Sequence, residues 1–461
     1  MIERLRALVL RADARRLFWS LCSRFGSTVL SFAVLFAASH SLQTSEYGLY
    51  IFLFSVGTSL GLIFTFGQHI LLVKHFRLKD HQRGKTNQAL LRVNAFWLAI
   101  GCGGQLLVAL LLLLSPWDLP SPYRELPVAL LFGAIFTMSE YFQNYFRIHG
   151  QIVLALVPRE NLWRIASAVC LPAVAFAGLL SSGSAATELV TGLLFIVTGY
   201  QTVRFVQQEG LWFLREPQVA ADRKTLRIWR QESANFTANG FFNSAAAYFE
   251  TILIGVAIGL EAAAFYFVAY RISMLLTLPV LAIDTVGVPL ISARFQEDDK
   301  VGAQKVVAML SAGSFALALI GGVFLYFTGP FVLHLFDPAF VEHSGVLLIL
   351  CLSAITHAFF GPGTWVIMIG GGERYLLILR CVVFGFYVLL LFGLGKWLGL
   401  TGIAIAGWAQ LLAVHLFSRR WVMRRWQVDN MATAILGLRR RQAAERSATD
   451  PVAVGEGDAP V

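Results

Sequence analysis

The chain has 461 residues, of which 57% are hydrophobic and only 14% charged, and its mean hydropathy is +0.67. Soluble domains contain roughly 45–50% apolar and 25% charged residues, so a large soluble enzyme, a disordered scaffold and a secreted disulfide module are excluded. The five cysteines all fall in apolar stretches without paired spacing, and they indicate no disulfide or metal site. The sequence predicts an integral membrane protein with many spans.

The chain begins with a basic segment, residues 1–16, which we interpret as a cytoplasmic amphipathic segment rather than a cleavable signal. Crossing a bilayer takes about 20 mostly apolar residues. Runs of this kind predict twelve transmembrane helices, at 17–39, 47–72, 92–115, 126–147, 158–180, 186–206, 234–257, 262–293, 304–328, 343–368, 376–395 and 400–419. The eighth run is long enough to require tilt or a kink, for which Pro279 and Pro289 provide places.

The distribution of basic residues predicts that both termini are cytoplasmic. With the amino terminus inside, all but four of the 37 Lys and Arg fall in inner segments, as the positive-inside rule requires. Arg124 and Lys396 lie in outer loops, whereas Arg24 and Arg271 lie within spans. The net charge of +10 is therefore a topology signal, and nucleic acid is not an expected partner.

The longest inner connection divides the predicted spans into two sets of six. We therefore expect an all-α fold of two six-helix bundles around a central cavity, with an amino-terminal bundle at 17–206 and a carboxy-terminal bundle at 234–420. A cytoplasmic linker at 207–233 joins them. Residues 421–461 form a predicted cytoplasmic tail that is disordered toward its end, where Gly, Asp, Pro and Ala predominate.

Several spans carry polar side chains at helical spacing. Asn235, Asn239 and Asn243 lie at i, i+4 and i+8 of the seventh span. They line a wet cavity or form contacts between helices, and either role fits the pattern. The first span carries Arg24 and the eighth Arg271, at depths of roughly 10 Å and 13 Å, judged from a rise of about 1.5 Å per residue. Ionisable groups at such depth usually face a bundle interior or a hydrated cavity.

Three acids are also placed within predicted spans: Glu140, Glu250 and Asp284. They form ion pairs with arginines, or they bind a coupling cation, either sodium or a proton. The pattern fits both roles. Glu140 with Arg147 is a candidate salt bridge, and Arg147 also has the alternative of extending to the headgroups. His357 in the tenth span is more typical of a buried histidine than of a relay.

No motif for nucleotide or metal chemistry appears. The chain lacks Gly-x-x-x-x-Gly-Lys-Ser/Thr, His-Glu-x-x-His, Cys-x-x-Cys and Gly-x-Ser-x-Gly, so we expect no catalytic residue, no cofactor and no resident metal. The short outer loops also argue against a membrane-embedded glycan polymerase or ligase. These features favour a transporter without its own nucleotide engine.

Three sequence segments resemble a known family when their order is considered. These segments are Ser45-Glu46-Tyr47-Gly48-Leu49-Tyr50 with Gly67, then Ala269-Tyr270-Arg271-Ile272 with Leu278-Pro279 and Val288-Pro289-Leu290-Ile291-Ser292, and finally Phe336-Asp337-Pro338-Ala339-Phe340. Over roughly 15–425, the chain resembles the bacterial polysaccharide transporter family, the Wzx-type flippases of the multidrug/oligosaccharidyl-lipid/polysaccharide exporter superfamily.

That resemblance implies alternating access between two bundles, with undecaprenyl-diphosphate-linked repeat units flipped across the inner membrane for O-antigen, capsule or exopolysaccharide assembly. Family cavities tend to be cationic, and the matching positions are Arg24 and Arg271. Expected partners are the lipid-linked oligosaccharide, membrane lipids, and polysaccharide polymerase and chain-length proteins, with the flippase itself a monomer. The alternative within the superfamily is a cation-coupled drug or metabolite antiporter, which an acid-lined cavity would favour.

Overall fold

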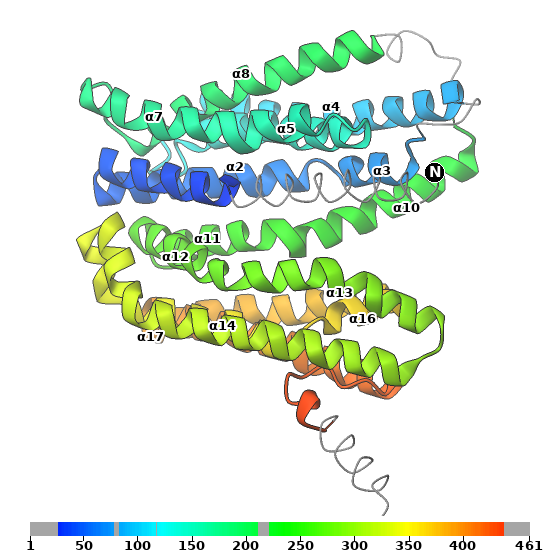
Figure 1. The fold of residues 1–461 in the computed structure, drawn as a ribbon. Helices are drawn as coiled ribbons and strands as arrows, with labels where there is room; N and C mark the ends of the chain where they lie inside the picture. The colour runs from blue at the N-terminus through cyan, green and yellow to red at the C-terminus, as the bar shows by residue number, and fades with distance from the viewer. Residues whose placement is uncertain (1–25, 78–82, 117, 211–220, 438–461) are drawn as a thin grey trace, which may run out of the picture. The chain divides into compact units, whose positions relative to one another are not determined.

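The computed structural model describes residues 26–77, 83–116, 118–210 and 221–437. Within these ranges the chain is helical throughout and contains no β-strand (Figure 1). The predicted all-α fold is therefore confirmed. The amphipathic segment 1–16 lies outside the described residues.

The described residues form two compact units. Unit 1 comprises Met1–Val268 and Phe331–Glu342, and unit 2 comprises Ala269–Pro330 and His343–Val461. The helices that lie in unit 1 are Gly26–Ser41, α2 (Thr44–Ile63), α3 (Gln68–His75), α4 (Arg83–Leu114), α5 (Leu126–Ile148), α6 (Ile152–Leu156), the π-turn η1 (Val157–Leu162), α7 (Trp163–Phe176), α8 (Gly183–Glu209), α10 (Arg223–Gly240), the π-turn η2 (Phe241–Ala245) and α11 (Ala246–Ala257).

The remaining helices lie in unit 2 or cross the division between the units. They are α12 (Leu260–Ser273), the 3-10 turn η3 (Met274–Thr277), α13 (Leu278–Gln296), α14 (Lys300–Phe336), the 3-10 helix η4 (Pro338–His343), α15 (Ser344–Phe360), α16 (Gly363–Ile369) and α17 (Glu373–Trp426). The division falls after Val268, within α12, whereas the sequence predicts the junction in the linker 207–233. The predicted bundles at 17–206 and 234–420 remain a prediction.

Nine helices among the described residues are long and apolar enough to cross a membrane. The predicted first span is represented by the 16 described residues Gly26–Ser41. The predicted fifth span is broken by η1, which leaves only 14 residues in α7. The predicted last two spans lie in one 54-residue element, α17. The count of twelve therefore remains a prediction.

Helix α17 contains the clearest backbone break. At about 1.5 Å per residue its 54 residues would extend about 80 Å, well beyond a hydrocarbon layer of about 30 Å. Gly399 has φ 59° and ψ −142°, which interrupts the helix between the two predicted spans. Glycine permits this positive φ because it has no Cβ.

The long eighth run is also broken, close to where proline predicts a kink. Helix α12 ends at Ser273, the 3-10 turn η3 follows, and α13 begins at Leu278 with a proline in its first turn. A proline has no N–H to donate to the preceding turn, so the helical hydrogen-bond ladder is interrupted there. Pro289 lies inside α13.

Small residues allow α2 and α5 to pack closely in unit 1. A Cβ on Gly61 would lie 2.9 Å from the Phe136 ring, which leaves no room for a side chain. The hydroxyl of Thr137 donates to the carbonyls of Gly61 at 3.0 Å and Gly133 at 2.9 Å. Gln105 of α4 in turn donates to the Thr137 hydroxyl at 3.2 Å. Small residues and interhelical hydrogen bonds are the usual means of packing helices in lipid.

Two predicted polar segments are ordered. Residues 223–233 of the predicted linker form the beginning of α10. After α17 the predicted tail folds back on unit 2, where Val428 and Asn430 are completely buried. The Asn430 side chain donates to the Phe360 carbonyl at 2.6 Å, and the Ser311 hydroxyl donates to the Asn430 carbonyl at 2.9 Å. The first part of the predicted tail is therefore packed, whereas its end, which is predicted to be disordered, lies outside the described residues.

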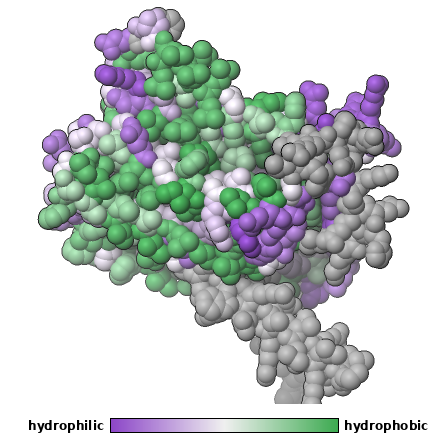
Figure 2. Space-filling view, turned by 90° about the horizontal axis from the view of Figure 1, so that it is seen from above, coloured by the Kyte–Doolittle hydropathy of each residue, from purple (hydrophilic) through white to green (hydrophobic). Residues whose placement is uncertain are grey.

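The outer surface of the helices is apolar, as a bilayer requires. Large apolar side chains are exposed at helical spacing on α4, at Leu107, Leu111 and Leu114, and again on α14 at Phe324 and Phe327. Figure 2 shows a face covered mostly by hydrophobic residues, with hydrophilic residues gathered mainly toward its margins. Continuous exposed apolar surface of this kind is not found on soluble monomers. The protein is a multi-pass membrane protein.

Candidate functional site

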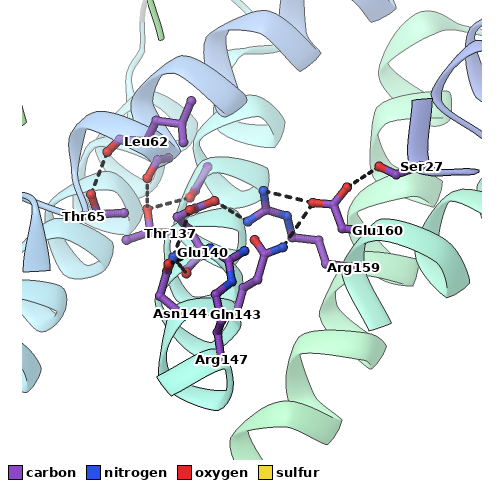
Figure 3. Close-up of polar contacts among 12 residues, drawn as sticks. Ser27, Leu62, Thr65, Thr137, Glu140, Gln143, Asn144, Arg147, Arg159 and Glu160 are labelled. Carbon is purple, nitrogen blue, oxygen red and sulfur yellow. Dashed lines mark hydrogen bonds and ion pairs between the residues drawn. The ribbon is translucent and has the colours of Figure 1, made fainter. Parts of the chain in front are cut away.

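Unit 1 holds a buried group of charged side chains, which we name the Arg159 cluster. It consists of Ser27, Glu140, Arg159, Glu160 and Arg164, and Figure 3 shows its central ion pairs. The residues come from the helix Gly26–Ser41, from α5, and from the consecutive elements η1 and α7. The site is therefore a product of tertiary packing.

The π-turn η1 supplies the central residues. Its backbone makes wider turns than the α-helices on either side, and Pro158 lies at its start. Proline disrupts regular α-helical hydrogen bonding, and π-turns occur frequently at functional sites. The resulting turn carries Arg159 and Glu160 side by side in the chain. Arg164 follows Glu160 by four residues, which places both on one helical face.

Arg159 bridges two carboxylates. One guanidinium nitrogen donates to Glu140 on α5, and another lies 3.6 Å from a Glu160 oxygen. The Arg164 guanidinium lies 3.0 Å from the other Glu160 oxygen and also donates to the hydroxyl of Ser27. The Ser27 hydroxyl itself donates to Glu160 at 2.5 Å. The five groups thus form one connected network.

The network is largely removed from solvent. The side chains of Arg159, Glu140 and Glu160 are 11%, 14% and 16% exposed. The Arg159 guanidinium also lies over the Phe136 ring, 4.6 Å from its centroid, an arrangement that favours a cation. Removing charges from water costs several kcal/mol per ion, so such groups persist only when they are well paired.

A polar chain extends the network along α5. Gln143 donates to Glu160 at 3.3 Å, and Asn144 donates to Glu140 at 3.2 Å. The exposed Arg147 reaches the Asn144 side-chain oxygen at 3.5 Å and interacts electrostatically with Glu140. The proposed link between Glu140 and Arg147 is therefore present, but Arg159 is the arginine in direct contact with the carboxylate.

Cations exceed anions at this site. Arg147, Arg159 and Arg164 lie close to Glu140 and Glu160, so these five groups carry a formal charge of +1. Guanidinium groups bind phosphate and carboxylate through paired N–H donors. The arrangement is suited to an anionic ligand. No group of three or more His, Cys, Asp or Glu that could hold a metal ion occurs in the described part of the chain.

Most of the predicted site residues lie elsewhere. Arg24 lies outside the described residues. Arg271 is half-buried on α12, in unit 2. Asp284 lies on α13, where it accepts a hydrogen bond from the Trp365 indole at 3.2 Å. Of the predicted acids and arginines, the structure places only Glu140 in the Arg159 cluster, a statement limited to residues it describes.

The asparagine stripe does not continue regularly. Asn235 is exposed on α10, and Asn239 donates to the Asn235 carbonyl within the same helix at 2.9 Å. Asn243 is exposed within η2. The i, i+4, i+8 spacing assumed an unbroken α-helix, and the π-turn shifts the register before Asn243. The role predicted for the three asparagines stays a prediction.

Glu250 and His357, the two remaining predicted residues, each form a hydrogen bond with a side chain. Glu250 on α11 accepts a hydrogen bond from the Tyr266 hydroxyl at 2.7 Å. His357 on α15 shares a hydrogen bond of 3.1 Å with His415 on α17. His357 is therefore a buried, hydrogen-bonded histidine, as the pattern favoured.

Sequence reasoning missed Arg159 and Glu160. Both fall at the predicted inner boundary of the fifth span, where charged residues are usually taken as headgroup contacts. The signal that was available is the Glu160–Arg164 spacing directly after Pro158. It indicates a charged face that continues into an apolar helix.

Comparison with known families identifies the chain. Residues 14–295 match the family described as polysaccharide biosynthesis protein, over more than half of the chain. The chain belongs to this family. A comparison with curated proteins gave no match.

Solved structures show which fold the family member adopts. An inward-facing multidrug resistance MATE family transporter of the MOP superfamily aligns with a TM-score of 0.69 and 16% identity, covering 87% of this chain and 94% of that chain. A MOP superfamily transporter from Pyrococcus furiosus, for which reverse polarity of the binding pocket suggests a different function, aligns with a TM-score of 0.57 and 16% identity, covering 88% and 93%. At such identities the likeness establishes a shared fold.

Proposed function

We propose that this protein is a flippase that translocates undecaprenyl-diphosphate-linked oligosaccharide repeat units across the bacterial inner membrane by alternating access. The observation that carries the proposal is the buried Arg159 cluster, with two arginines and a third beside it at Arg147, inside a membrane protein of the polysaccharide biosynthesis family. The MOP transporter fold supports a transport role over an enzymatic one. Assembly of O-antigen, capsule or exopolysaccharide is the pathway that such a flippase would serve.

The cluster suggests how the anionic part of the substrate is bound. A diphosphate entering unit 1 would compete with Glu140 and Glu160 for the guanidinium groups of Arg159 and Arg164. Because these arginines are already fixed by their carboxylate partners, little side-chain ordering would be needed on binding. Arg24 and Arg271 are the further arginines proposed to bind the diphosphate or anionic sugars.

The neutral polar residues are proposed to bind the sugars. Asn235, Asn239 and Asn243 each offer an amide that can donate to and accept from hydroxyl groups. Asn235 on α10 and Asn243 in η2 are both exposed and lie eight residues apart. We propose that they contact different parts of the glycan.

Energy coupling is assigned most readily to Asp284. Glu140 already has an arginine partner, and Glu250 accepts from the Tyr266 hydroxyl. The partner of Asp284 is the neutral Trp365 indole, and the described residues give this carboxylate no ion pair. A half-buried acid without a fixed cation can take up a proton or sodium ion, and the membrane potential supplies about 2.3 kcal/mol per charge per 100 mV.

The alternative function is a cation-coupled drug or metabolite antiporter. Support for it comes from the multidrug resistance MATE family transporter whose fold this chain shares. Cationic drugs require an acidic binding site, however, and in the Arg159 cluster both acids are already paired with arginines. A drug-efflux assay in a sensitised host separates the two functions. A glycan polymerase or ligase is the third candidate, and it would change the length of the glycan in proteoliposomes.

Complementation tests the flippase proposal. A bacterial strain that lacks its own flippase receives the wild-type chain or the Arg159→Lys, Arg24→Ala or Arg271→Ala variants, and surface polysaccharide is measured at matched protein level. We expect loss of polymer for each variant, because lysine at 159 keeps the charge without the paired donors. Arg294→Ala is the control, since Arg294 forms only exposed pairs. Full export by all three variants would refute the anion-binding role.

The assembly proposals follow from the same function. We propose inner-membrane localisation with both termini cytoplasmic, action as a monomer, and transient contact with polysaccharide polymerase and chain-length proteins. Crosslinking of the protein in its native membrane, followed by mass spectrometry, tests these contacts.

A further inference from the structure

A hydrogen bond joins α16 to the proposed coupling acid on α13. The indole nitrogen of Trp365 donates to a carboxylate oxygen of Asp284 at 3.2 Å. Both helices belong to unit 2, where they pack against each other (Figure 1). The Trp365 side chain is 39% exposed and Asp284 is half-buried, so the pair lies at the margin of unit 2 and not in its apolar core. An indole can only donate, and it therefore needs a carboxylate that a cation would also use.

Helix α16 holds the indole on a fixed support. Val366 and Ile367 follow Trp365 directly and are completely buried. They belong to one apolar cluster with Ile291 of α13. At the beginning of α16, a Cβ on Gly363 would lie 2.4 Å from a side-chain nitrogen of the segment after α17, so this segment packs tightly there. The short helix is thus anchored by its buried face and at its first residue.

The part of α13 that carries Asp284 is bounded by two breaks in helical hydrogen bonding. The 3-10 turn η3 precedes α13, which has a proline in its first turn, and Pro289 lies inside α13, five residues after Asp284. Proline has no N–H to donate and its ring clashes with the preceding turn, so helices bend at such points. Ile291 lies beyond Pro289 and is fixed in the buried cluster. Residues 278–288 can therefore tilt while the rest of α13 stays packed.

The described elements that pack against residues 278–288 contain no second carboxylate. Helix α16 and the turn η3 have no ionisable side chain, and α13 has one besides Asp284, Arg294, ten residues later. Val280 of α13 also packs against α14 and α15, and neither of these helices contains an acid. The basic residues of α14 and α15 are Lys300, Lys305, His334 and His357. Among these elements, Asp284 is thus the one carboxylate that a cation can use.

We propose that Trp365 is a positioning residue, which holds residues 278–288 against α16 until a sodium ion or a proton binds at Asp284. The inference rests on the proposed coupling role of that acid. A bound cation cancels the charge of the carboxylate, and the indole hydrogen bond then loses its charge-assisted strength. Cation binding thereby frees the first part of α13 to tilt at Pro289, and cation release restores the bond. The indole links the occupancy of the ion site to the position of a helix.

Hydrogen–deuterium exchange of the purified full-length protein in detergent tests the proposal without a transport substrate. Exchange in the peptide that covers residues 278–288 is compared in sodium and in choline at constant ionic strength and pH. A second series varies the pH without sodium, with rates corrected for their intrinsic pH dependence. In the wild type, the effective cation should speed exchange about tenfold, which corresponds to about 1.4 kcal/mol, because a released helix opens more often.

Variants connect this response to the hydrogen bond. Trp365→Phe keeps a ring but removes the donor, so exchange without cation should be about tenfold faster and should respond little to the cation. Trp365→His keeps a ring N–H and should restore part of the response. Asp284→Asn should not respond, and adding Trp365→Phe to it should change exchange less than in the wild type, since the indole acts through the carboxylate. Trp397→Phe is the matched control, because this tryptophan of α17 is 85% exposed and should leave wild-type behaviour.

Three outcomes would overturn the inference. One is exchange in the wild type that neither cation changes. The second is a Trp365→Phe variant that behaves like the wild type. The third is equal acceleration in Trp365→Phe and Trp397→Phe, which would indicate a general effect of lost aromatic area.

The coupling role of Asp284 is measured separately, from the gradient-dependent flux of Asp284→Asn in proteoliposomes. If that variant loses its gradient dependence while any of the three outcomes holds, the coupling role stands and only the role of Trp365 is removed.

Discussion

The two units differ in how polar side chains are paired in their interiors. Unit 1 buries full charges, with Arg159 held between Glu140 and Glu160. In unit 2, α15 and α17 are joined by groups that pair without a salt bridge, the imidazoles of His357 and His415. One imidazole must accept for this bond to form, so at most one of the pair is charged.

The difference indicates where specificity for an anion would reside. Buried ion pairs are a poor way to stabilise a helix bundle, because apolar residues of similar volume often serve equally well. A charged network that persists inside a membrane protein is therefore more economically explained by function than by stability. We infer that unit 1 carries the principal anion-binding groups and that unit 2 contributes chiefly packing, with Arg271 and Asp284 as its proposed functional residues.

The largest effect is expected from Arg159→Ala. Removing this guanidinium leaves Glu140 and Glu160 buried without their shared partner, which should lower the free energy of unfolding by about 3–5 kcal/mol. Thermal and denaturant unfolding of the protein in detergent measure the loss. Arg294→Ala is the control, because its side chain is 48% exposed and its pairs should contribute at most about 1 kcal/mol. Similar losses for the two variants would mean that the cluster is effectively solvated.

In unit 2 the largest expected effect comes from Asn430→Ala. The substitution removes the donor to the Phe360 carbonyl and leaves a cavity beside α15, so unfolding should become easier by about 1–3 kcal/mol. Thr433→Ala, at an exposed position three residues later, should change stability by less than about 0.5 kcal/mol. If Asn430→Ala unfolds like the wild type, the segment after α17 does not stabilise unit 2.

The sequence predicted the helices well because transmembrane runs are a local signal. About 20 apolar residues in succession predict a span regardless of its neighbours. The π-turns η1 and η2 could not be predicted in this way, because the choice between two backbone hydrogen-bond patterns depends on what packs against the helix. Asn235 and Asn239 therefore lie in the regular helix α10, whereas Asn243 lies in the π-turn η2.

The candidate site was predicted only in part for the same reason. Glu140 was recognised as an intramembrane acid, but its partner Arg159 lies 19 residues away on another element. The packing of Asn430 was not predicted either, because it depends on the hydrogen bond from its amide to the Phe360 carbonyl at the end of α15. Composition indicates only the average polarity of a segment, whereas the pairing of Glu140 and the packing of Asn430 each depend on one specific hydrogen bond.

A smaller effect is expected from His415→Phe in unit 2. The substitution removes the hydrogen bond to His357, worth about 0.5–1.5 kcal/mol. It also removes the second ring nitrogen of His415, which is buried and has no hydrogen-bond partner. The two effects oppose each other, so the unfolding free energy should change by no more than about 1 kcal/mol. A loss comparable to that of Arg159→Ala would contradict the contrast between the units.

The smallest effect on stability is expected from Asp284→Asn. This substitution should alter transport while leaving the unfolding free energy nearly unchanged. The amide oxygen can still accept the Trp365 hydrogen bond, so the unfolding free energy should stay within about 0.5 kcal/mol of the wild type. If Asp284 is the coupling acid, translocation in proteoliposomes should lose its dependence on an imposed cation gradient, because an amide binds neither a proton nor sodium as a carboxylate does. Asp298→Asn is the control at an exposed turn with φ 54°, a conformation that asparagine tolerates. If Asp284→Asn shows the same gradient-dependent flux as the control, the coupling acid is instead Glu250 or Glu140. Both of these lie in unit 1, so unit 2 would then have no role in coupling.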